Sequence, residues 1–227
     1  MESTLSHKTK LTLAAIAVII IAGSFTSADM NDSQRMLFTH ISQNEGLSQG
    51  IVVSCCQDSL GHMWFATHDG LNRYDGYHFT VYRNNPDDST SIADNLIRKV
   101  YTDSKGGLWV GTEKGLSFYD REKDIFKNYP TDGKSVTGIV DMEADGKFLV
   151  AAGGSVRMFD SVREQWLESA PPCQKDSFGA IIIYKSGPDI YIGTQQDGLF
   201  RYVPHTNELT KLASMSTIPV TDFPSVG

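Results

Sequence analysis

Cysteine, proline and long apolar runs are all scarce in this sequence, and each scarcity excludes a class of protein. Three cysteines and eight prolines among 227 residues are too few for a disulfide scaffold or a proline-rich disordered chain. Basic residues are outnumbered, 20 Lys and Arg against 27 Asp and Glu, so we expect no nucleic-acid partner. Hydrophobic residues still make up 40% of the chain, which is enough for a packed core.

The one extended apolar run lies at the N-terminus. Lys8 and Lys10 precede the uncharged residues 11–23, and small residues lead on to Ala28. A basic start, a short apolar run and a small-residue end predict a secretory signal peptide, a signal helix over residues 1–28. A retained membrane anchor is the alternative, although spanning a bilayer takes about 20 apolar residues. We therefore expect an exported protein.

The cysteines do not suggest a disulfide. Cys55 and Cys56 are adjacent in a predicted strand, so their side chains point to opposite faces. A bridge between such neighbours would be strained, and Cys173 could reach only one of them. We expect all three to be free, with Cys55 and Cys56 filling core space.

An internal repeat dominates the rest of the chain. Residues 58–75 recur at 103–120, an offset of 45 residues, and weaker copies occupy residues 143–160 and 186–202. The repeat signature consists of Asp58, Gly61, Trp64, Thr67, Gly70, Leu71, Tyr74, Asp103, Gly106, Trp109, Gly111, Thr112, Gly115, Leu116, Tyr119, Gly146, Phe159, Tyr191, Gly193, Thr194, Gly198, Leu199 and Tyr202. A period of this length indicates stacked structural units.

Each repeat is predicted to form four short strands. In the first copy these are residues 51–58, 62–67, 71–75 and 77–83, separated by turns that contain Asp and Gly. Four antiparallel strands per repeat are typical of a β-propeller blade, and one blade cannot bury both faces alone. Between blades we expect Trp64, Phe65, Leu71, Trp109, Leu116 and Leu199, with Gly111 and Gly193 where another group comes close.

The predicted fold is therefore all-β, a partial propeller of about four blades. The chain divides into a signal peptide at 1–28, a lead-in at 29–50, blades at 51–95, 96–135, 136–177 and 178–217, and the start of a fifth blade at 218–227. Residues 36–41 are predicted to form an orphan strand that closes the ring. Because the fifth repeat stops early, we expect a fragment of a longer protein, with unpaired strand edges.

The repeat resembles a known family. Residues 103–120 satisfy the pattern D-x-x-G-x-[LI]-W-[IV]-G-T-x-x-G-L-x-x-[YF]-D throughout, and residues 38–52 are similar to the family's opening segment. The family is the two-component regulator propeller repeat, found in the periplasmic sensor region of hybrid two-component histidine kinases of Gram-negative bacteria. The resemblance implies a periplasmic location, an oligosaccharide ligand and an inner-membrane anchor in the full-length relative. It also implies further blades and a protein histidine kinase downstream; we expect the full-length form to be a homodimer.

No catalytic, cofactor or metal site is expected from the residues. The aspartates that recur beside Gly or Ser are interpreted as turn-capping residues: Asp58, Asp69, Asp75, Asp103, Asp120, Asp145 and Asp160. The six histidines show no zinc spacing, and no phosphate loop or G-x-S-x-G sequence occurs. The aromatic residues Tyr74, Tyr119, Phe159 and Tyr202 repeat in every blade, which favours packing over stacking on sugars.

The ligand-binding residues stay unknown at this stage. Residues that do not repeat are better candidates, and we single out Arg73, Arg98, Lys99 and Gln195, which are predicted on turns. Three functions stay open. They are a sensor module that relays a signal to a kinase, a propeller enzyme of the lyase or glycosidase type, and a passive interaction scaffold. The repeat signature together with the export signal favours the sensor.

Overall fold

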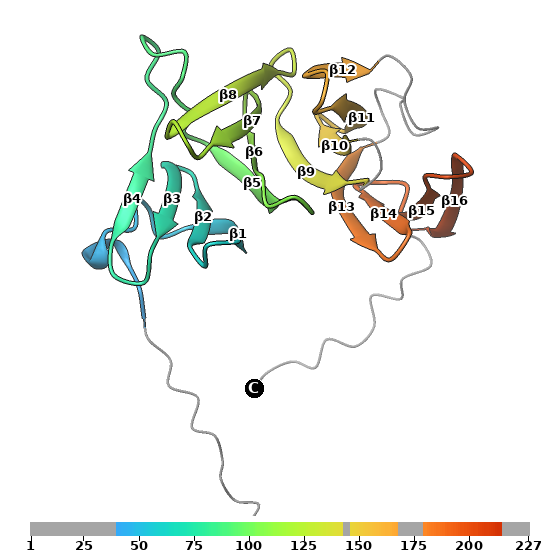
Figure 1. The fold of residues 1–227 in the computed structure, drawn as a ribbon. Helices are drawn as coiled ribbons and strands as arrows, with labels where there is room; N and C mark the ends of the chain where they lie inside the picture. The colour runs from blue at the N-terminus through green and yellow to red at the C-terminus, as the bar shows by residue number, and fades with distance from the viewer. Residues whose placement is uncertain (1–39, 143–145, 168–178, 215–227) are drawn as a thin grey trace, which may run out of the picture. The chain divides into compact units, whose positions relative to one another are not determined.

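The structure is a computed structural model and describes residues 40–142, 146–167 and 179–214. Of the described residues, those from Ile41 onward belong to one unit. This unit consists of a short 3-10 helix η1 (Gln43–Glu45) and sixteen β-strands (Figure 1). None of the described helices is long and apolar enough to cross a membrane.

The strands form four antiparallel sheets, each built from four consecutive strands. Blade 1 comprises β1 (Val52–Gln57), β2 (Met63–Thr67), β3 (Gly70–Tyr74) and β4 (Phe79–Tyr82). Blade 2 comprises β5 (Ile97–Thr102), β6 (Leu108–Thr112), β7 (Gly115–Asp120) and β8 (Ile125–Pro130). Blade 3 comprises β9 (Val136–Asp141), β10 (Lys147–Ala152), β11 (Ser155–Asp160) and β12 (Gln165–Leu167). Blade 4 comprises β13 (Ala180–Ser186), β14 (Asp189–Thr194), β15 (Leu199–Val203) and β16 (Glu208–Ala213).

The prediction of an all-β fold made of four-stranded propeller blades is confirmed by this order. The first strands of successive blades contact one another, β1 with β5, β5 with β9 and β9 with β13, so these are the inner strands. Each inner strand pairs with the next strand through a register shift near its beginning. Such a bulge increases local twist, and here it recurs in every blade.

Apolar side chains fill the three spaces between successive blades. Trp64 of blade 1 is fully buried against Val100 and Tyr119 of blade 2. Trp109 of blade 2 packs against Phe148 and Phe159 of blade 3, with ring centroids 4.7 and 5.7 Å away. Blade 3 packs against blade 4 mainly through aliphatic residues, together with the buried ring of Tyr202. Burial of these surfaces is the main stabilising contribution to the stack, at about 25 cal/mol per Å² of apolar area.

Two residues expected between blades lie elsewhere. Leu199 is 38% exposed, because no strand among residues 40–214 that the structure describes covers this face of blade 4. Its counterparts Leu71 and Leu116 are fully buried by the following blade. Phe65 packs against Phe79 within its own blade, with ring centroids 6.1 Å apart. The repeat pattern therefore predicts which face a residue occupies, while burial depends on the neighbouring sheet.

The second hairpin of a blade is held by a threonine and a glycine. The hydroxyl of Thr67 donates to the carbonyl of Gly70 at 2.8 Å, and Thr112 makes the same bond to Gly115 at 2.9 Å. Gly70 has a φ of 106°, a conformation that favours glycine. In blade 3, Ser155 replaces the glycine and its hydroxyl donates back to the carbonyl of Ala152.

Several predictions lie outside the described residues. They are the signal peptide at 1–28, the part of the orphan strand at 36–39, the aspartate at 145, the third cysteine at 173 and the fifth blade at 218–227. Of the orphan strand, only His40 and Ile41 are described, and neither is in a strand.

Candidate functional site

The repeated aspartate of blade 1 holds the turn between β1 and β2. One oxygen of Asp58 accepts the backbone N–H groups of Leu60 and His62, at 2.9 and 3.0 Å. The other accepts the indole N–H of Trp64 at 2.9 Å. One carboxylate thus caps the turn and fixes the ring that fills the space between blades 1 and 2.

The same arrangement recurs in blade 2. Asp103 accepts the backbone N–H groups of Lys105 and Gly107, and the indole N–H of Trp109 at 2.8 Å. Asp75 and Asp160 also cap turns through backbone N–H groups. Asp69 differs, because it pairs with Arg83 at 2.9 Å.

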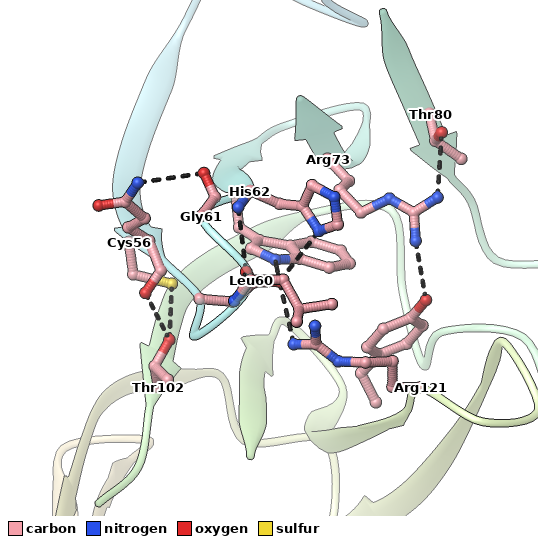
Figure 2. Close-up of polar contacts among 12 residues, drawn as sticks. Cys56, Leu60, Gly61, His62, Arg73, Thr80, Thr102 and Arg121 are labelled. Atoms are coloured by element: carbon pink, nitrogen blue, oxygen red, sulfur yellow. Dashed lines mark hydrogen bonds and ion pairs between the residues drawn. The ribbon is translucent and has the colours of Figure 1, made fainter. Parts of the chain in front are cut away.

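The turn of blade 1 is also fastened to blade 2. The guanidinium of Arg121 reaches Asp58 from blade 2 at 3.0 Å, and the His62 ring nitrogen Nδ1 lies 3.4 Å from the same oxygen (Figure 2). Burial alone would raise the pKa of Asp58. The hydrogen bonds from Trp64 and the backbone, together with the charge of Arg121, outweigh burial and hold this pKa below its ordinary value of 3.8.

A second polar group crosses the same boundary. The Tyr119 hydroxyl donates to Asp124 at 2.5 Å, and the Tyr82 hydroxyl of blade 1 donates to Asp124 at 2.8 Å. Arg73 of blade 1 donates to the Tyr119 hydroxyl at 3.1 Å and to Thr80 at 3.5 Å, as Figure 2 shows for Arg73 and Thr80. Burial and the nearby Asp124 raise the pKa of Tyr119, while the hydrogen bond from Tyr119 lowers the pKa of Asp124.

Other residues of the repeat signature also serve local structure. Gly61, Gly106 and Gly146 have positive φ angles of 88°, 83° and 65° at the turns between first and second strands. Phe159 and Tyr202 are buried, like Tyr119. A Cβ on Gly111 would lie 2.5 Å from the carbonyl oxygen of Val136 in blade 3, and one on Gly193 would lie 2.6 Å from the Ile182 side chain. The other residues of the repeat signature are the hairpin residues already described, Tyr74 on β3, and Tyr191 and Thr194 on β14.

A cavity of about 560 Å³ opens where the inner strands of blades 2, 3 and 4 end. Its wall contains the ends of β5, β9 and β13 and the turns that follow β5 and β13. We call this the inner-strand cavity. Its volume lies within the range of small-molecule sites, which is roughly 300–1,000 Å³.

The inner-strand cavity combines charged and aromatic groups. Lys99 and Tyr101 come from β5, and Tyr184 and Lys185 come from β13. The buried Asp141 of β9 accepts hydrogen bonds from the backbone N–H and hydroxyl of Ser104, and its own N–H donates to the Tyr101 hydroxyl at 3.1 Å. Tyr184 is 65% exposed. Such a wall can stack on a flat, polar ligand and donate hydrogen bonds to it.

All four ligand candidates were predicted on turns, and this is wrong for three of them, which lie on strands. Arg73 belongs to β3 and lies over the rings of Trp64 and Tyr82, at 5.8 and 5.7 Å from their centroids. Arg98 belongs to β5 and pairs with Glu113 at 2.9 Å. Both arginines are partly buried, and each already has a partner within the protein.

The other two ligand candidates, Lys99 and Gln195, lie in different places. Lys99 belongs to β5 and lines the inner-strand cavity. Gln195 follows β14 and is exposed, with its backbone N–H donating to Gly179 at 2.8 Å. Of the four candidates, the structure brings only Lys99 into the inner-strand cavity.

Sequence reasoning missed most of this cavity. Its polar residues Thr102, Asp141 and Lys185 occupy one position, the last or next-to-last residue of the inner strand. With Gln57 in blade 1, four blades hold four different polar side chains there. This variation within an otherwise regular repeat was the signal in the sequence that could have indicated a ligand site. Residues that pack between blades recur in every repeat, whereas residues that contact a ligand do not.

The cysteines differ from the prediction in one respect. Cys55 and Cys56 are both free, but Cys55 is exposed and so does not fill core space. Cys56 packs against the core between blades 1 and 2 and accepts a hydrogen bond from Thr102 at 3.5 Å. Cys55 points to the opposite face of β1. None of the four blades in the described part of the chain covers this face.

Comparisons with known proteins agree with the repeat. Residues 46–69 and 91–114 match the two component regulator propeller family. The chain is 41% identical to histidine kinase P4 from Formosa agariphila over 75 residues. These residues make up 33% of this chain and 6% of that protein. The predicted resemblance to two-component regulator propeller repeats is confirmed.

Solved structures give the same picture of the fold. The extracellular domain of a hybrid two-component system from B. thetaiotaomicron is similar with a TM-score of 0.63 and 26% identity, over 77% of this chain and 26% of that chain. Virginiamycin B lyase from Staphylococcus aureus is similar with a TM-score of 0.57 and 16% identity, over 73% of this chain and 56% of that chain. The lyase shares the fold alone. The chain thus spans about a quarter of the sensor domain that it resembles.

Proposed function

We propose, from the premise that this chain carries two-component regulator propeller repeats, that it is part of the ligand-sensing region of a hybrid two-component sensor histidine kinase. The observation that carries the proposal is the agreement of two independent similarities. The repeats match at residues 46–69 and 91–114, and the blades resemble an extracellular domain of a hybrid two-component system.

The location that we propose is the periplasm. Residues 1–28 would act as the export signal, and the full-length protein would be anchored in the inner membrane. Further blades and a kinase would complete the sensor, which we propose to be a homodimer. The proposed location and the proposed further domains are supported by the similarity of this chain to extracellular domains of two-component systems.

The ligand that we propose is an oligosaccharide bound in the inner-strand cavity. The exposed side chain of Tyr184 offers a flat apolar surface, and Lys99 and Ser104 offer polar groups around it. Sugar rings have apolar faces and polar edges, so they fit a wall that presents one aromatic ring among polar groups. Since three blades line the cavity, an occupant would change how those blades pack, and this change would be relayed to the kinase.

The proposed region has no catalytic activity of its own. Among residues 40–142, 146–167 and 179–214, no group of three His, Cys, Asp or Glu side chains is placed to hold a metal ion. Asp103 and Asp141, the carboxylates of the cavity wall, are engaged by turn and inter-blade hydrogen bonds. A lyase or glycosidase, or a passive scaffold, are the alternatives that the experiment must separate.

Calorimetric titration of the full chain with a panel of neutral and acidic oligosaccharides tests the proposal. We expect binding of at least one class, and at least a tenfold loss of affinity in Tyr184→Ala. Tyr77→Ala is the matched control, since Tyr77 is 85% exposed and lies outside the cavity. Chromatography of the titrated mixtures should show unchanged oligosaccharide.

Two outcomes contradict the proposal. New products in the mixtures would establish the enzyme, and a complete absence of binding would leave the scaffold. The relay is measured separately, as autophosphorylation of the full-length sensor with and without the bound oligosaccharide.

A further inference from the structure

Lys99 occupies an unusual position for a charged residue. It lies on the inner strand β5 directly after the register shift, opposite Gly111 of β6. The residues paired in the same way in the other blades are Ser54, Gly138 and Ile182. Lys99 is therefore the one charged residue among the four at this position of the inner strand, and its stem can lie along the wall of the inner-strand cavity.

The Lys99 ammonium forms no ion pair with any residue in the part of the chain that the structure describes. Two other lysines of blade 2 show the contrast. Lys114 lies 2.9 Å from Asp94, and Lys127 lies 2.6 Å from Glu164. The charge of Lys99 is thus left for solvent or a ligand.

The carboxylates that share the cavity wall are committed elsewhere. Asp103 accepts three hydrogen bonds from the turn and from Trp109. Asp141 accepts two from Ser104 across the boundary between blades 2 and 3. The donors around these oxygens offset much of their potential, whereas Lys99 has no such partner among the described residues.

A neutral ligand that filled the cavity would remove water from Lys99 without replacing it by a counter-charge. Removing a charge from water is unfavourable unless a partner of opposite charge is supplied. A carboxylate or sulfate on the ligand would supply that partner through charge-assisted hydrogen bonds, which are stronger than neutral ones. The chain as a whole carries a formal charge of −7, so such a ligand would be drawn to this cavity by the charge of Lys99 and not by the overall field.

We infer that the inner-strand cavity selects an oligosaccharide that carries a negatively charged group, and that Lys99 recognises this group. The inference rests on the proposed function, because it takes the ligand to be an oligosaccharide. The shared chemistry is an anionic substituent on a sugar ring, either a carboxylate or a sulfate ester.

Matched ligands that differ only in charge test the inference. We would titrate the full chain with trigalacturonate and with its trimethyl ester, and with a sulfated galactan oligosaccharide and its desulfated form. At least one acidic ligand should bind tenfold or more tightly than its neutral partner. That preference should weaken as salt is raised, because salt screens the charge.

Lys99→Gln should reduce the affinity for the acidic ligand about tenfold and leave the neutral one unchanged. Lys211→Gln is the control, since Lys211 lies over Phe200 on blade 4, outside the cavity. Thermal unfolding of both variants checks that they fold. Equal affinities within each pair, or an unchanged acidic preference in Lys99→Gln, would overturn the inference while leaving oligosaccharide binding in place. Absence of binding by every oligosaccharide would overturn the proposed function itself.

Discussion

The indole N–H of Trp64 donates a 2.9 Å hydrogen bond to the carboxylate of Asp58, whose side chain is completely buried. The same carboxylate caps the turn between β1 and β2 and pairs with Arg121 of blade 2. A buried charge is tolerated only where it is paired and hydrogen-bonded. Asp58 therefore joins a turn, a core ring and a blade boundary.

Replacement of Asp58 tests this linkage. Asp58→Asn removes the charge that Arg121 faces and places an amide N–H₂ among groups that all donate. We expect the free energy of unfolding to fall by about 2–3 kcal/mol at pH 7. Urea unfolding followed by tryptophan fluorescence measures the change. Asp69→Asn is the control, because its pair with Arg83 is half-exposed and should contribute less than about 1 kcal/mol. Equal losses in the two variants would contradict the role of burial.

The contribution of Asp58 should depend on pH. Its pKa is held below 3.8 in the folded protein, so folding favours the ionised form. The stabilisation is fully present above the unfolded value of about 3.8–3.9 and is lost as the pH falls through the lower folded value. The difference between wild type and Asp58→Asn should therefore shrink from pH 5 to pH 2 in urea unfolding series. A difference that is constant over this range would show that the charge is not what stabilises the turn.

The hydroxyl of Tyr119 provides a separate test at the same blade boundary. It bonds to Asp124 at 2.5 Å and receives a bond from Arg73 at 3.1 Å. Tyr119→Phe should lower the free energy of unfolding by about 1.5–3 kcal/mol, since hydrogen bonds to charged groups contribute that much. The ring itself should be tolerated, because Phe159 fills the same position in blade 3.

Tyr74→Phe is the matched control for Tyr119→Phe. Tyr74 holds the corresponding position in blade 1, and its hydroxyl bonds only to the backbone of Gly76 in an exposed turn. Its loss should be no more than about 1 kcal/mol. A larger effect at Tyr74 than at Tyr119 would contradict the role of the inter-blade contacts.

Ionisation of Tyr129 should destabilise the protein at high pH. Burial, together with nearby Glu164, raises the pKa of Tyr129 to about 12. A raised folded pKa means that the stabilisation is complete below the unfolded value of about 10 and is lost as the pH rises toward 12. Urea unfolding at pH 9, 10 and 11 should show a decline that is smaller in Tyr129→Phe. An identical decline in the variant would show that Tyr129 is not responsible.

The sequence was sufficient for the features that repeat. The six-residue spacing from Asp58 to Trp64 recurs from Asp103 to Trp109, and it predicted both a turn and an inter-blade ring. Local hydrogen bonds and alternation along a strand determine such features, so one copy of the repeat carries the information. The blades and their strand order followed from the same pattern.

The inner-strand cavity could not be derived in this way. Lys99, Asp141 and Tyr184 follow one another at intervals of about 40 residues and meet only because β5, β9 and β13 are neighbours in the stack. The exposure of a side chain could not be predicted from the repeat either, since Leu199 has the same place in the repeat as the buried Leu71. Both properties depend on the packing of separate sheets, which no single repeat encodes.

Glycine at position 111 is required by the approach of two blades. A Cβ there would lie 2.5 Å from the carbonyl oxygen of Val136, a backbone atom that cannot rotate away. Gly111→Ala should force β6 and β9 apart and lower the free energy of unfolding by about 1–3 kcal/mol, as overpacking does. Gly50→Ala is the control, because its φ is ordinary and its nearest neighbour would be 4.0 Å away. Since alanine restricts the unfolded chain, Gly50→Ala should be neutral or slightly stabilising in the same urea measurement. Equal stability of the two variants would show that the blades can separate at Gly111 without loss, and that their packing is looser than the structure describes.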